Sequence, residues 1–346
     1  MIKNQMLRRI ITDAQVRELK QLLIDAQKIV ITCHVSPDGD AVGSSLCLLH
    51  LLHKMGKEAH VVTPDMIPPS LTFLPGLKDV VVYTRQELMA KHFMNEADLI
   101  VCLDFNAPYR VDRLSPVLLS AKGRKVLIDH HLEPEDFTDL VISYPKMSST
   151  CELLFRLIYA MGLMKYMSKW SATCLYTGMM TDTGNFTYNS NDPDLYIIIA
   201  ELLRFGIDKD NIYNMAMNTF SADRLRLMGY ALSEKMILFP EVGGALIELT
   251  HDELVKYHYQ RGDTESLVNR PLAIPGIYWS IFLRDDVEYI KVSARSTGEF
   301  AVNVYCEQYF SGGGHKNAAG GEFRGSMGDA KKLVYDIVEN LKQNNN

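Results

Sequence analysis

Short apolar runs alternate with helical patterns along the first half of the chain. The runs are rich in Val and Ile and predict buried strands, while apolar positions that recur every three to four residues between them predict helices. The expected strands are 28–32, 58–63, 98–104, 125–129 and 139–144. Because strands that alternate with helices form β-α-β units, the pattern predicts a parallel sheet covered by helices.

The pattern changes twice in the second half. It is helical at about 190–235 and β-type from about 240. The β-type runs are followed by a further helical pattern, then by a glycine-rich loop at 311–321 and a capped helix at 326–343. We predict an α/β fold in two domains with a cleft between them. The predicted boundaries are 1–190 for a parallel-sheet domain, 191–235 for a helical connector and 236–346 for a smaller C-terminal α/β domain.

Composition excludes some classes of protein. With 346 residues, of which 47% are hydrophobic and 23% charged, the chain is long enough for two globular domains. Its net charge of −6 argues against a broad basic surface for long nucleic acid. Its six cysteines include no C-x-x-C pair, which indicates buried thiols in a reducing compartment, and no apolar run is long enough to span a membrane. We therefore expect a cytoplasmic protein.

Carboxylates and imidazoles follow the predicted strands at their carboxyl ends, where parallel α/β sheets bind ligands. Three such groups follow the first strand, one ends the third, three end the fourth, and one more ends a predicted helix of the same domain. They are His34, Asp38 and Asp40, then Asp104, then Asp129, His130 and His131, and Asp182. The sequence thus predicts one edge of the sheet that is crowded with negative charge and histidine.

Divalent cations would relieve the repulsion within such a cluster. Mixed imidazole and carboxylate ligands favour Mn²⁺, Fe²⁺, Co²⁺ or Zn²⁺ over Ca²⁺, and an all-oxygen set would have indicated Mg²⁺. The ligands outnumber those that one ion takes, so we predict two ions that share a carboxylate, an arrangement suited to phosphoryl displacement. Taken singly, each Asp also fits a turn or a helix N-cap, and each His a structural role. Their joint occurrence at successive strand ends is what favours the metal site.

The same motifs resemble those of the DHH phosphoesterase superfamily. Asp129-His130-His131 is the run that names it, and HVSPDGDAVGS (34–44), VCLDFN and GMMTDTGNF resemble three further motifs in the family's order. SGGGHKNAAGG, with VSARS upstream, resembles the companion domain called DHHA1. The resemblance covers roughly residues 20–340 and is greatest to the short DHH–DHHA1 group, which includes bacterial nanoRNases that also act as pAp phosphatases.

The resemblance implies roles for the residues of the cluster. The implied ligands are His34, Asp38 and Asp104 for one ion and Asp40, Asp104, His130 and Asp182 for the other. Asp104 would bridge the ions, and a water between them would be the nucleophile. The implied catalytic set is Asp104, Asp129, which would orient an imidazole, and His131, which would face the scissile phosphate. Pro37 and Gly39 are expected to supply the turn that lets Asp38 and Asp40 diverge.

The second domain is expected to bind substrate phosphate. The resemblance gives this role to Arg295 and to the run Gly312, Gly313, Gly314 and His315. Exposed N–H groups of a glycine loop can cradle phosphate, and an Arg offers a planar fork. From the residues alone, a glycine-rich turn with a surface Arg accounts for the pattern equally well. Arg110, close after Asp104, is a further candidate phosphate contact.

Our leading hypothesis is a phosphoesterase with two divalent ions, Mn²⁺ first and Mg²⁺ or Co²⁺ as alternatives. Its expected substrates are short single-stranded oligoribonucleotides and 3′-phosphoadenosine 5′-phosphate. A pApA or cyclic di-AMP phosphodiesterase stays open, as does a non-catalytic module that senses a nucleotide. We expect neither long duplex nucleic acid nor a membrane as partner, and a homodimer stays open.

Overall fold

The computed structural model describes residues 7–344, and the outermost positions of the two expected domains lie outside the described residues. The chain forms two compact units, which divide between Thr219 and Phe220. This division lies inside the segment 191–235 that we interpret as a connector. None of the helices described is long and apolar enough to cross a bilayer.

The first unit is built on a six-stranded parallel sheet in the order β3-β2-β1-β4-β5-β6. Its strands are β1 (Lys28–Thr32), β2 (Glu58–Thr63), β3 (Val80–Val82), β4 (Leu99–Leu103), β5 (Arg124–Asp129) and β6 (Leu140–Ser143). The five strands predicted from the apolar runs are confirmed, with bounds within one residue of those expected. β3 was missed because three residues are too short to show a period. The strand order reverses between β1 and β4, which is where sheets of this kind bind ligands.

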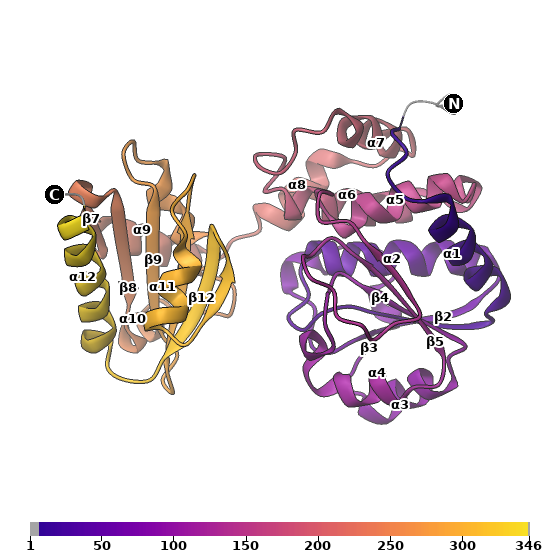
Figure 1. Ribbon diagram of the computed structural model, residues 1–346, viewed down its shortest axis with the longest axis horizontal. Helices are drawn as coiled ribbons and strands as arrows, with labels where there is room; N and C mark the ends of the chain where they lie inside the picture. The colour runs from indigo at the N-terminus through magenta and orange to yellow at the C-terminus, as the bar shows by residue number, and fades with distance from the viewer. Residues whose placement is uncertain (1–6, 345–346) are drawn as a thin grey trace. The chain divides into compact units, whose positions relative to one another are not determined.

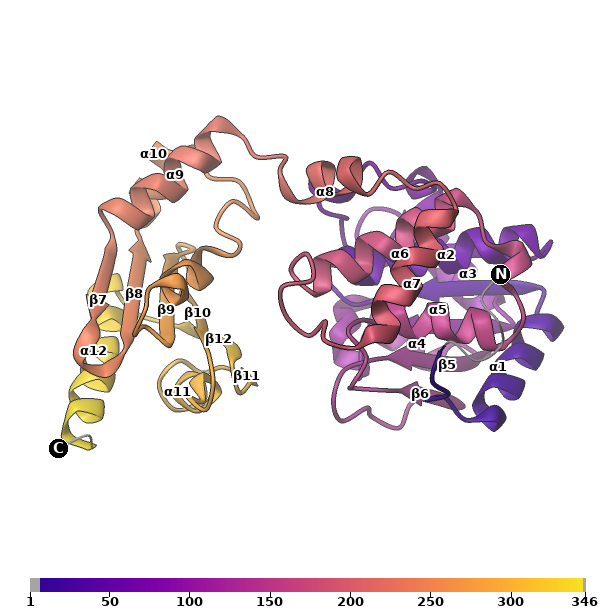
Figure 2. The same cartoon turned by 90° about the horizontal axis from the view of Figure 1, so that it is seen from above.

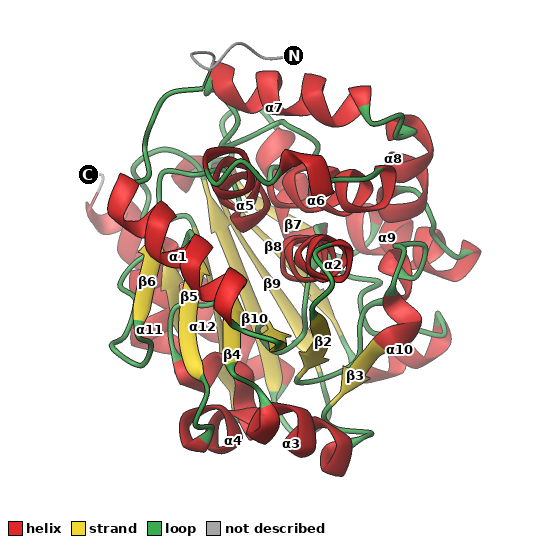
Figure 3. Ribbon diagram, turned by 90° about the vertical axis from the view of Figure 1, so that its right-hand side faces the viewer, coloured by secondary structure: helices red, strands yellow, loops and turns green. Residues whose placement is uncertain are grey.

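Helices cover both faces of this sheet; in Figure 1, α2 and α5 lie above it and α3 and α4 below it, and Figure 3 shows the layers from the side. Successive residues of β1 serve opposite faces: Ile29 and Ile31 pack in one core cluster and Val30 in the other. The first cluster contains residues of α1 (Asp13–Asp25), α2 (Gly39–Lys54), α5 (Thr150–Ala160), α6 (Lys169–Asp182), α7 (Pro193–Arg204) and α8 (Lys209–Met217). The second contains residues of α3 (Glu87–Glu96) and α4 (Ser115–Ser120). Short 3₁₀ helices occupy Pro69–Leu71, Leu77–Asp79, Pro108–Leu114 and Met164–Tyr166.

The second unit has its own six-stranded sheet, in the order β11-β12-β10-β9-β8-β7 (Figure 2). Its strands are β7 (Met236–Phe239), β8 (Gly244–Leu249), β9 (Trp279–Asp285), β10 (Ile290–Ser296), β11 (Gly313–His315) and β12 (Ala318–Phe323). Only the β8–β9 pair is parallel. One core cluster joins the sheet to α11 (Val302–Tyr309) and α12 (Met327–Asn344). The other joins it to α9 (Ala222–Ser233), α10 (His251–Lys256) and the 3₁₀ segment Leu267–Ala273.

The glycine-rich segment of the second unit is a hairpin, so the expectation of a loop at 311–321 was wrong. β11 pairs with β12 across Gly313–Gly320 and His315–Ala318. The two backbones lie so close that a Cβ on Gly312 would stand 2.0 Å from the carbonyl oxygen of Gly320. Because glycine has no side chain, these strands show no alternation of apolar and polar residues and cannot be recognised from the sequence.

Candidate metal centre

The loop after β1 carries His34 and Asp38 and leads directly into α2, whose second residue is Asp40. The turn is made at Ser36, whose φ of 52° lies in the left-handed region. Asp38 is the N-cap of α2, and its Oδ1 accepts hydrogen bonds from the backbone N–H groups of Asp40 and Ala41 at 3.0 and 3.1 Å. The turn role expected for Gly39 was therefore wrong. Gly39 is the first residue of α2, and a Cβ there would lie 2.2 Å from the hydroxyl oxygen of Thr181.

Asp104 stands at the centre of the cluster, in the first position after β4. Its φ of 64° is uncommon for a residue other than glycine, and its side chain is buried. Asp104 Oδ2 lies 3.5 Å from Nε2 of His34, and Asp104 Oδ1 lies 3.6 Å from Nε2 of His130. The two oxygens of one carboxylate thus face two different imidazoles.

The remaining candidate ligands complete two groups that share Asp104. On the first side, Asp38 Oδ1 lies 3.8 Å from Nε2 of His34. On the second, Asp182 Oδ2 and Asp40 Oδ2 lie 3.4 and 3.9 Å from Nε2 of His130. The structure therefore brings together the six residues that were predicted to hold metal.

The imidazole rings are oriented from behind by backbone carbonyls. His34 Nδ1 lies 2.8 Å from the carbonyl oxygen of Val35, and His130 Nδ1 lies 3.3 Å from that of Met147. Because Nδ1 donates its proton to a carbonyl, the Nε2 atom of the neutral ring carries the lone pair. This is the tautomer that binds a cation.

Asp40 is held by the start of α5. The backbone N–H of Thr150 donates to Asp40 Oδ2 at 2.6 Å, and that of Cys151 donates to Asp40 Oδ1 at 2.8 Å. These N–H groups have no partner within their own helix and lie at its positive end, so they suit a carboxylate. The Asp40 side chain is 1% exposed and is fixed by both oxygens.

Close packing of α2 on α6 brings Asp182 to the same place. A Cβ on Gly43 of α2 would lie 2.5 Å from the carbonyl oxygen of Cys174, and a Cβ on Gly178 of α6 would lie 2.2 Å from Cys151 Sγ and 2.9 Å from Asp40 Oδ1. A larger residue at either glycine would push the helices apart. Both glycines are therefore part of how the site is built.

Several pKa values in the cluster are shifted because charged groups are buried close together. Burial, together with the charge of Asp104, raises the pKa of Asp40 well above its usual range and raises that of Asp182 to about 7. Burial acts to lower the pKa of His34, but hydrogen bonds with Asp104 and Asp38 outweigh it and raise that pKa. Burial acts to raise the pKa of Asp104, yet the hydrogen bond and charge of His34 hold it below its usual range. A cluster of this kind takes up protons or cations to balance its charge.

The donor atoms fit divalent cations. Nitrogen and oxygen atoms of three groups lie within 4.8 Å of one another: His34, Asp38 and Asp104; Asp40, His130 and Asp182; and Asp104, His130 and His131. The mixed donors suit Mn²⁺, Co²⁺ or Zn²⁺. The third group fits less well, because the Nδ1 atom of His131 already lies 2.7 Å from Asp129 Oδ1.

Asp129 and His131 form a separate pair beside the candidate ligands. Asp129 ends β5 and is fully buried, so its hydrogen bond fixes the imidazole of His131 through Nδ1. Burial acts to lower the pKa of His131, but this bond and the charge of Asp104 raise it, and Arg110 acts against them. Arg110 thus lies within electrostatic reach of His131. A protonated His131 keeps Nε2–H for another acceptor.

The second unit brings its own candidate residues together. Across β10, β12 and β11, Arg295 is paired with Ala318, and Ala318 with His315. Residues in one row of a sheet point to the same face, so Arg295 and His315 are two strands apart on one face, about 10 Å between Cα atoms. The Arg295 guanidinium donates to the carbonyl of Ala294 at 2.9 Å. Gly314 has a φ of 138°, and a Cβ there would lie 2.7 Å from the carbonyl oxygen of Ala318, so at least part of the glycine run serves strand pairing.

Thr150 is at the cluster but was missed from the sequence. Its hydroxyl donates to Asp104 Oδ1 at 2.9 Å. Its neighbour Ser149 is the N-cap of α5 and accepts from the backbone N–H of Glu152, while the Glu152 carboxylate accepts from the backbone N–H and hydroxyl of Ser148. The available signal was a hydroxyl at the first turn of a helix that follows a strand of the same sheet.

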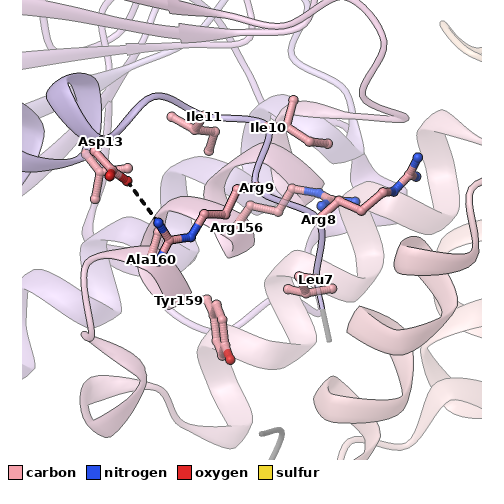
Figure 4. A pocket seen from close by; sticks show the side chains of 10 residues that line it. Leu7, Arg8, Arg9, Ile10, Ile11, Asp13, Arg156, Tyr159 and Ala160 are labelled. Atoms are coloured by element: carbon pink, nitrogen blue, oxygen red, sulfur yellow. Dashed lines mark ion pairs between the residues drawn. The ribbon is translucent and has the colours of Figure 1, made fainter. Parts of the chain in front are cut away.

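A pocket elsewhere in the first unit contains none of the predicted residues. It lies where the described N-terminal segment passes the end of α5 (Figure 4). Its three arginines pair with carboxylates: Arg8 with Asp192 and Asp194, Arg9 with Asp13, and Arg156 with Glu152 and Asp194. Each arginine among the described residues that line it thus has a carboxylate partner, and none of the candidate metal ligands lines it, so the candidate site remains the cluster around Asp104.

Comparison with known proteins identifies the family. The model of the DHH family N-terminal domain matches residues 28–179, and that of the DHHA1 domain matches residues 249–343. The chain is 32% identical over 315 residues to the bifunctional oligoribonuclease and PAP phosphatase NrnA of Thermus thermophilus, covering 90% of this chain and 89% of that protein. It is 26% identical to the cyclic-di-AMP phosphodiesterase PdeA of Listeria monocytogenes, covering 93% of this chain and 49% of that protein.

A solved structure gives the same assignment. The crystal structure of an exopolyphosphatase-related protein from Bacteroides fragilis matches with a TM-score of 0.95 at 49% identity, covering 97% of this chain and 99% of that one. Together with the two domain matches and the relative from Thermus thermophilus, this likeness leaves no ambiguity about descent. The chain belongs to the DHH family, with an N-terminal DHH domain followed by a DHHA1 domain.

Proposed function

We propose that this protein is a phosphoesterase that uses two divalent cations to hydrolyse short oligoribonucleotides and 3′-phosphoadenosine 5′-phosphate. The observation that carries the proposal is the position of Asp104, whose two oxygens lie 3.5 and 3.6 Å from the Nε2 atoms of His34 and His130. A carboxylate placed in this way suits a bridge between two ions. The mixed donor set supports Mn²⁺, with Co²⁺ next and Mg²⁺ less favoured.

The candidate ligands divide between two ions. His34 and Asp38 would hold one ion, Asp40, His130 and Asp182 the other, and Asp104 both. When bound, the cations supply a water of lowered pKa and neutralise charge on the phosphate. Two such ions account for why four carboxylates, of which Asp40 and Asp104 are buried, lie so close together.

Two other residues of this site, His131 and Arg110, would act on the phosphate directly. Asp129 fixes His131 through Nδ1, so that protonated His131 donates from Nε2 to a phosphate oxygen. Arg110, within electrostatic reach of His131, adds a second positive charge for the same phosphate. His131 and Arg110 are not among the proposed metal ligands. Mutating either residue should therefore affect the reaction without removing metal binding.

The choice of substrate rests on the relatives and on the second unit. The relative from Thermus thermophilus carries oligoribonuclease and PAP phosphatase in its name. We assign Arg295, the run 312–314 and His315 to anchoring a terminal phosphate of the substrate, because Arg295 and His315 share one sheet face. The six cysteines are buried and free, which supports a reducing compartment and, with it, the cytoplasm.

A second candidate activity is hydrolysis of cyclic di-AMP or pApA. It is favoured by 26% identity to the phosphodiesterase from Listeria monocytogenes over 93% of this chain. The chemistry at the cations is the same for either substrate, so only the contacts to the rest of the nucleotide would distinguish them. A nucleotide-sensing module would make those contacts without turnover.

The test is a substrate panel with Mn²⁺, Co²⁺ or Mg²⁺. Di- to pentaribonucleotides, 3′-phosphoadenosine 5′-phosphate, pApA and cyclic di-AMP are each assayed by chromatography of the products. We expect turnover of the short oligoribonucleotides and of 3′-phosphoadenosine 5′-phosphate. Dominant activity on cyclic di-AMP or pApA would favour the second candidate, and nucleotide binding without turnover would favour the sensing module.

A matched pair of variants connects the activity to the site. Asp104→Asn removes the charge of the proposed bridge and should abolish turnover. Asp136→Asn makes the same change at an exposed position on the loop after β5 and should leave turnover intact. Full activity of the Asp104 variant would refute the two-ion assignment.

A further inference from the structure

Threonine hydroxyls along α6 bond to carbonyl oxygens of their own helix. The hydroxyls of Thr177 and Thr181, and that of the C-cap residue Thr183, donate to the carbonyl oxygens four residues earlier, at 2.9, 2.9 and 2.6 Å. This is the ordinary way for a buried Thr hydroxyl in a helix to be satisfied. It requires a full helical turn before the threonine.

Thr150 cannot make that bond, because it is the first residue of α5 and the residue four positions earlier lies outside the helix. Its side chain is fully buried, so its hydroxyl must find another acceptor. The acceptor is Asp104 Oδ1 at 2.9 Å, 46 positions away in sequence. The start of α5 thus contacts the proposed bridge through a side chain as well as Asp40 through its backbone.

The rotation of a buried aspartate carboxylate is fixed mainly by the groups that contact its two oxygens. The terminal torsion of Asp is broad and roughly two-fold, so the ligand plane must be set by its partners. Asp104 Oδ2 has His34 on one side, and Oδ1 has both His130 and the Thr150 hydroxyl. Thr is β-branched and stiff at χ1, which makes its hydroxyl a well-defined donor.

We propose that Thr150 is the positioning residue of the bridging carboxylate: its hydroxyl fixes Asp104 so that one oxygen faces each of the two cation positions. The same helix end fixes Asp40 through two N–H groups, so α5 sets the geometry of two ligands at once. This inference rests on the proposed function, since it requires the two-ion site. It adds a residue that acts through Asp104.

The test compares three substitutions that leave the backbone of α5 in place. Thr150→Val keeps the shape and removes the donor, Thr150→Ser keeps the donor and removes the methyl group, and Thr177→Val removes a hydroxyl that bonds only within α6. Mn²⁺ affinity and stoichiometry are measured by titration calorimetry. Exchange coupling between the two Mn²⁺ ions is read from their electron paramagnetic resonance spectrum.

We expect Thr150→Val to weaken Mn²⁺ binding by roughly 10- to 100-fold and to alter the coupled spectrum, as is usual when a hydrogen bond to a metal ligand is lost. Thr150→Ser should restore both properties, and Thr177→Val should leave both close to wild type. Should the valine variant fail to fold, Thr150→Ala, which removes the donor without β-branching, makes the same comparison.

The positioning role of Thr150 and the two-ion site can be refuted separately. If the wild-type protein binds two Mn²⁺ ions and Thr150→Val does so with the same affinity and spectrum, the positioning role is overturned and the two-ion site stands. If the wild-type protein binds no ion pair, both are overturned. Loss of metal binding in Thr150→Ser as large as that in Thr150→Val would also overturn the role assigned to the hydroxyl.

Discussion

Replacing Gly178 by alanine should destabilise the protein, although alanine is the better helix former. Gly178 lies in α6 where this helix packs on α2 and on the start of α5. A Cβ there would stand 2.2 Å from Cys151 Sγ, 2.9 Å from Asp40 Oδ1 and 3.0 Å from Asp40 Cα. Two of these atoms belong to a buried residue that is fixed by both of its oxygens, so they have little room to move.

The magnitude follows from two opposing terms. Alanine gains up to about 1 kcal/mol over glycine within a helix. Forcing an extra methyl group into a packed core costs about 1–3 kcal/mol, and the fixed neighbours here favour the upper end. The expected net loss is about 1–2 kcal/mol, which corresponds to a fall in Tm of about 3–6 °C for a unit of this size. Because Asp40 must shift, Mn²⁺ affinity should fall as well.

Gly229→Ala is the matched control. Gly229 lies inside α9, has an ordinary helical backbone, and a Cβ there would meet no atom within 4 Å. This variant should gain about 0.5–1 kcal/mol. Calorimetric unfolding scans and Mn²⁺ titration of both variants check the pair. A Gly178 variant as stable as wild type, with unchanged metal affinity, would refute the close packing of α2 on α6 on which the site depends.

Three further predictions concern single side chains. Burial acts to raise the pKa of Glu253, but hydrogen bonds from Tyr230, the backbone N–H of Thr250 and Lys235 hold it at about 2, so Glu253→Gln should cost about 2 kcal/mol at pH 7. The lowered pKa gives its full stabilisation above the unfolded value of 4.5 and loses it as the pH falls to about 2, so urea unfolding should show this cost shrinking over that interval. An equal cost at pH 7 and pH 3 would contradict the prediction. Asp129→Asn should lower kcat roughly 10- to 100-fold while calorimetry shows unchanged Mn²⁺ affinity, and a parallel loss of both would mean that the Asp129–His131 pair supports metal binding. Arg295→Ala should raise KM about 10-fold or more with kcat little changed, and an unchanged KM would remove Arg295 from the phosphate site.

The sequence was most informative where residue type and position in the sheet coincide. The predicted strands 28–32, 98–104 and 125–129 each have carboxylate or imidazole at their last residue or within the two residues after it, and parallel strands necessarily place those ends together. That argument needs only the alternation of strands and helices, which the apolar runs reveal. It therefore located both the sheet edge and the groups gathered on it.

The sequence was least informative where the backbone itself makes the contact. Asp40 is bound by N–H groups of α5, and every residue except proline has such a group, so no residue type marks this contact. Thr150 was missed for a related reason: a threonine near a cap suggests capping, and its actual partner lies 46 positions away. Long-range pairings of this kind follow from tertiary packing rather than from local pattern.

The glycines of the family motifs serve close packing of helices and close pairing of strands, and these roles differ from that of the metal ligands. Gly39 and Gly178 are empty positions against which Thr181 and Asp40 pack, and Gly312 and Gly314 allow β11 to approach β12. None of these contacts requires a bound ligand. Substituting such a glycine should therefore lower stability together with metal or substrate affinity, whereas substituting a ligand such as Asp104 should abolish turnover in a protein that still folds. A sequence motif of this family thus contains two kinds of residue: the ligands proposed to act on a phosphoester, and glycines whose lack of a side chain allows those ligands to come close together.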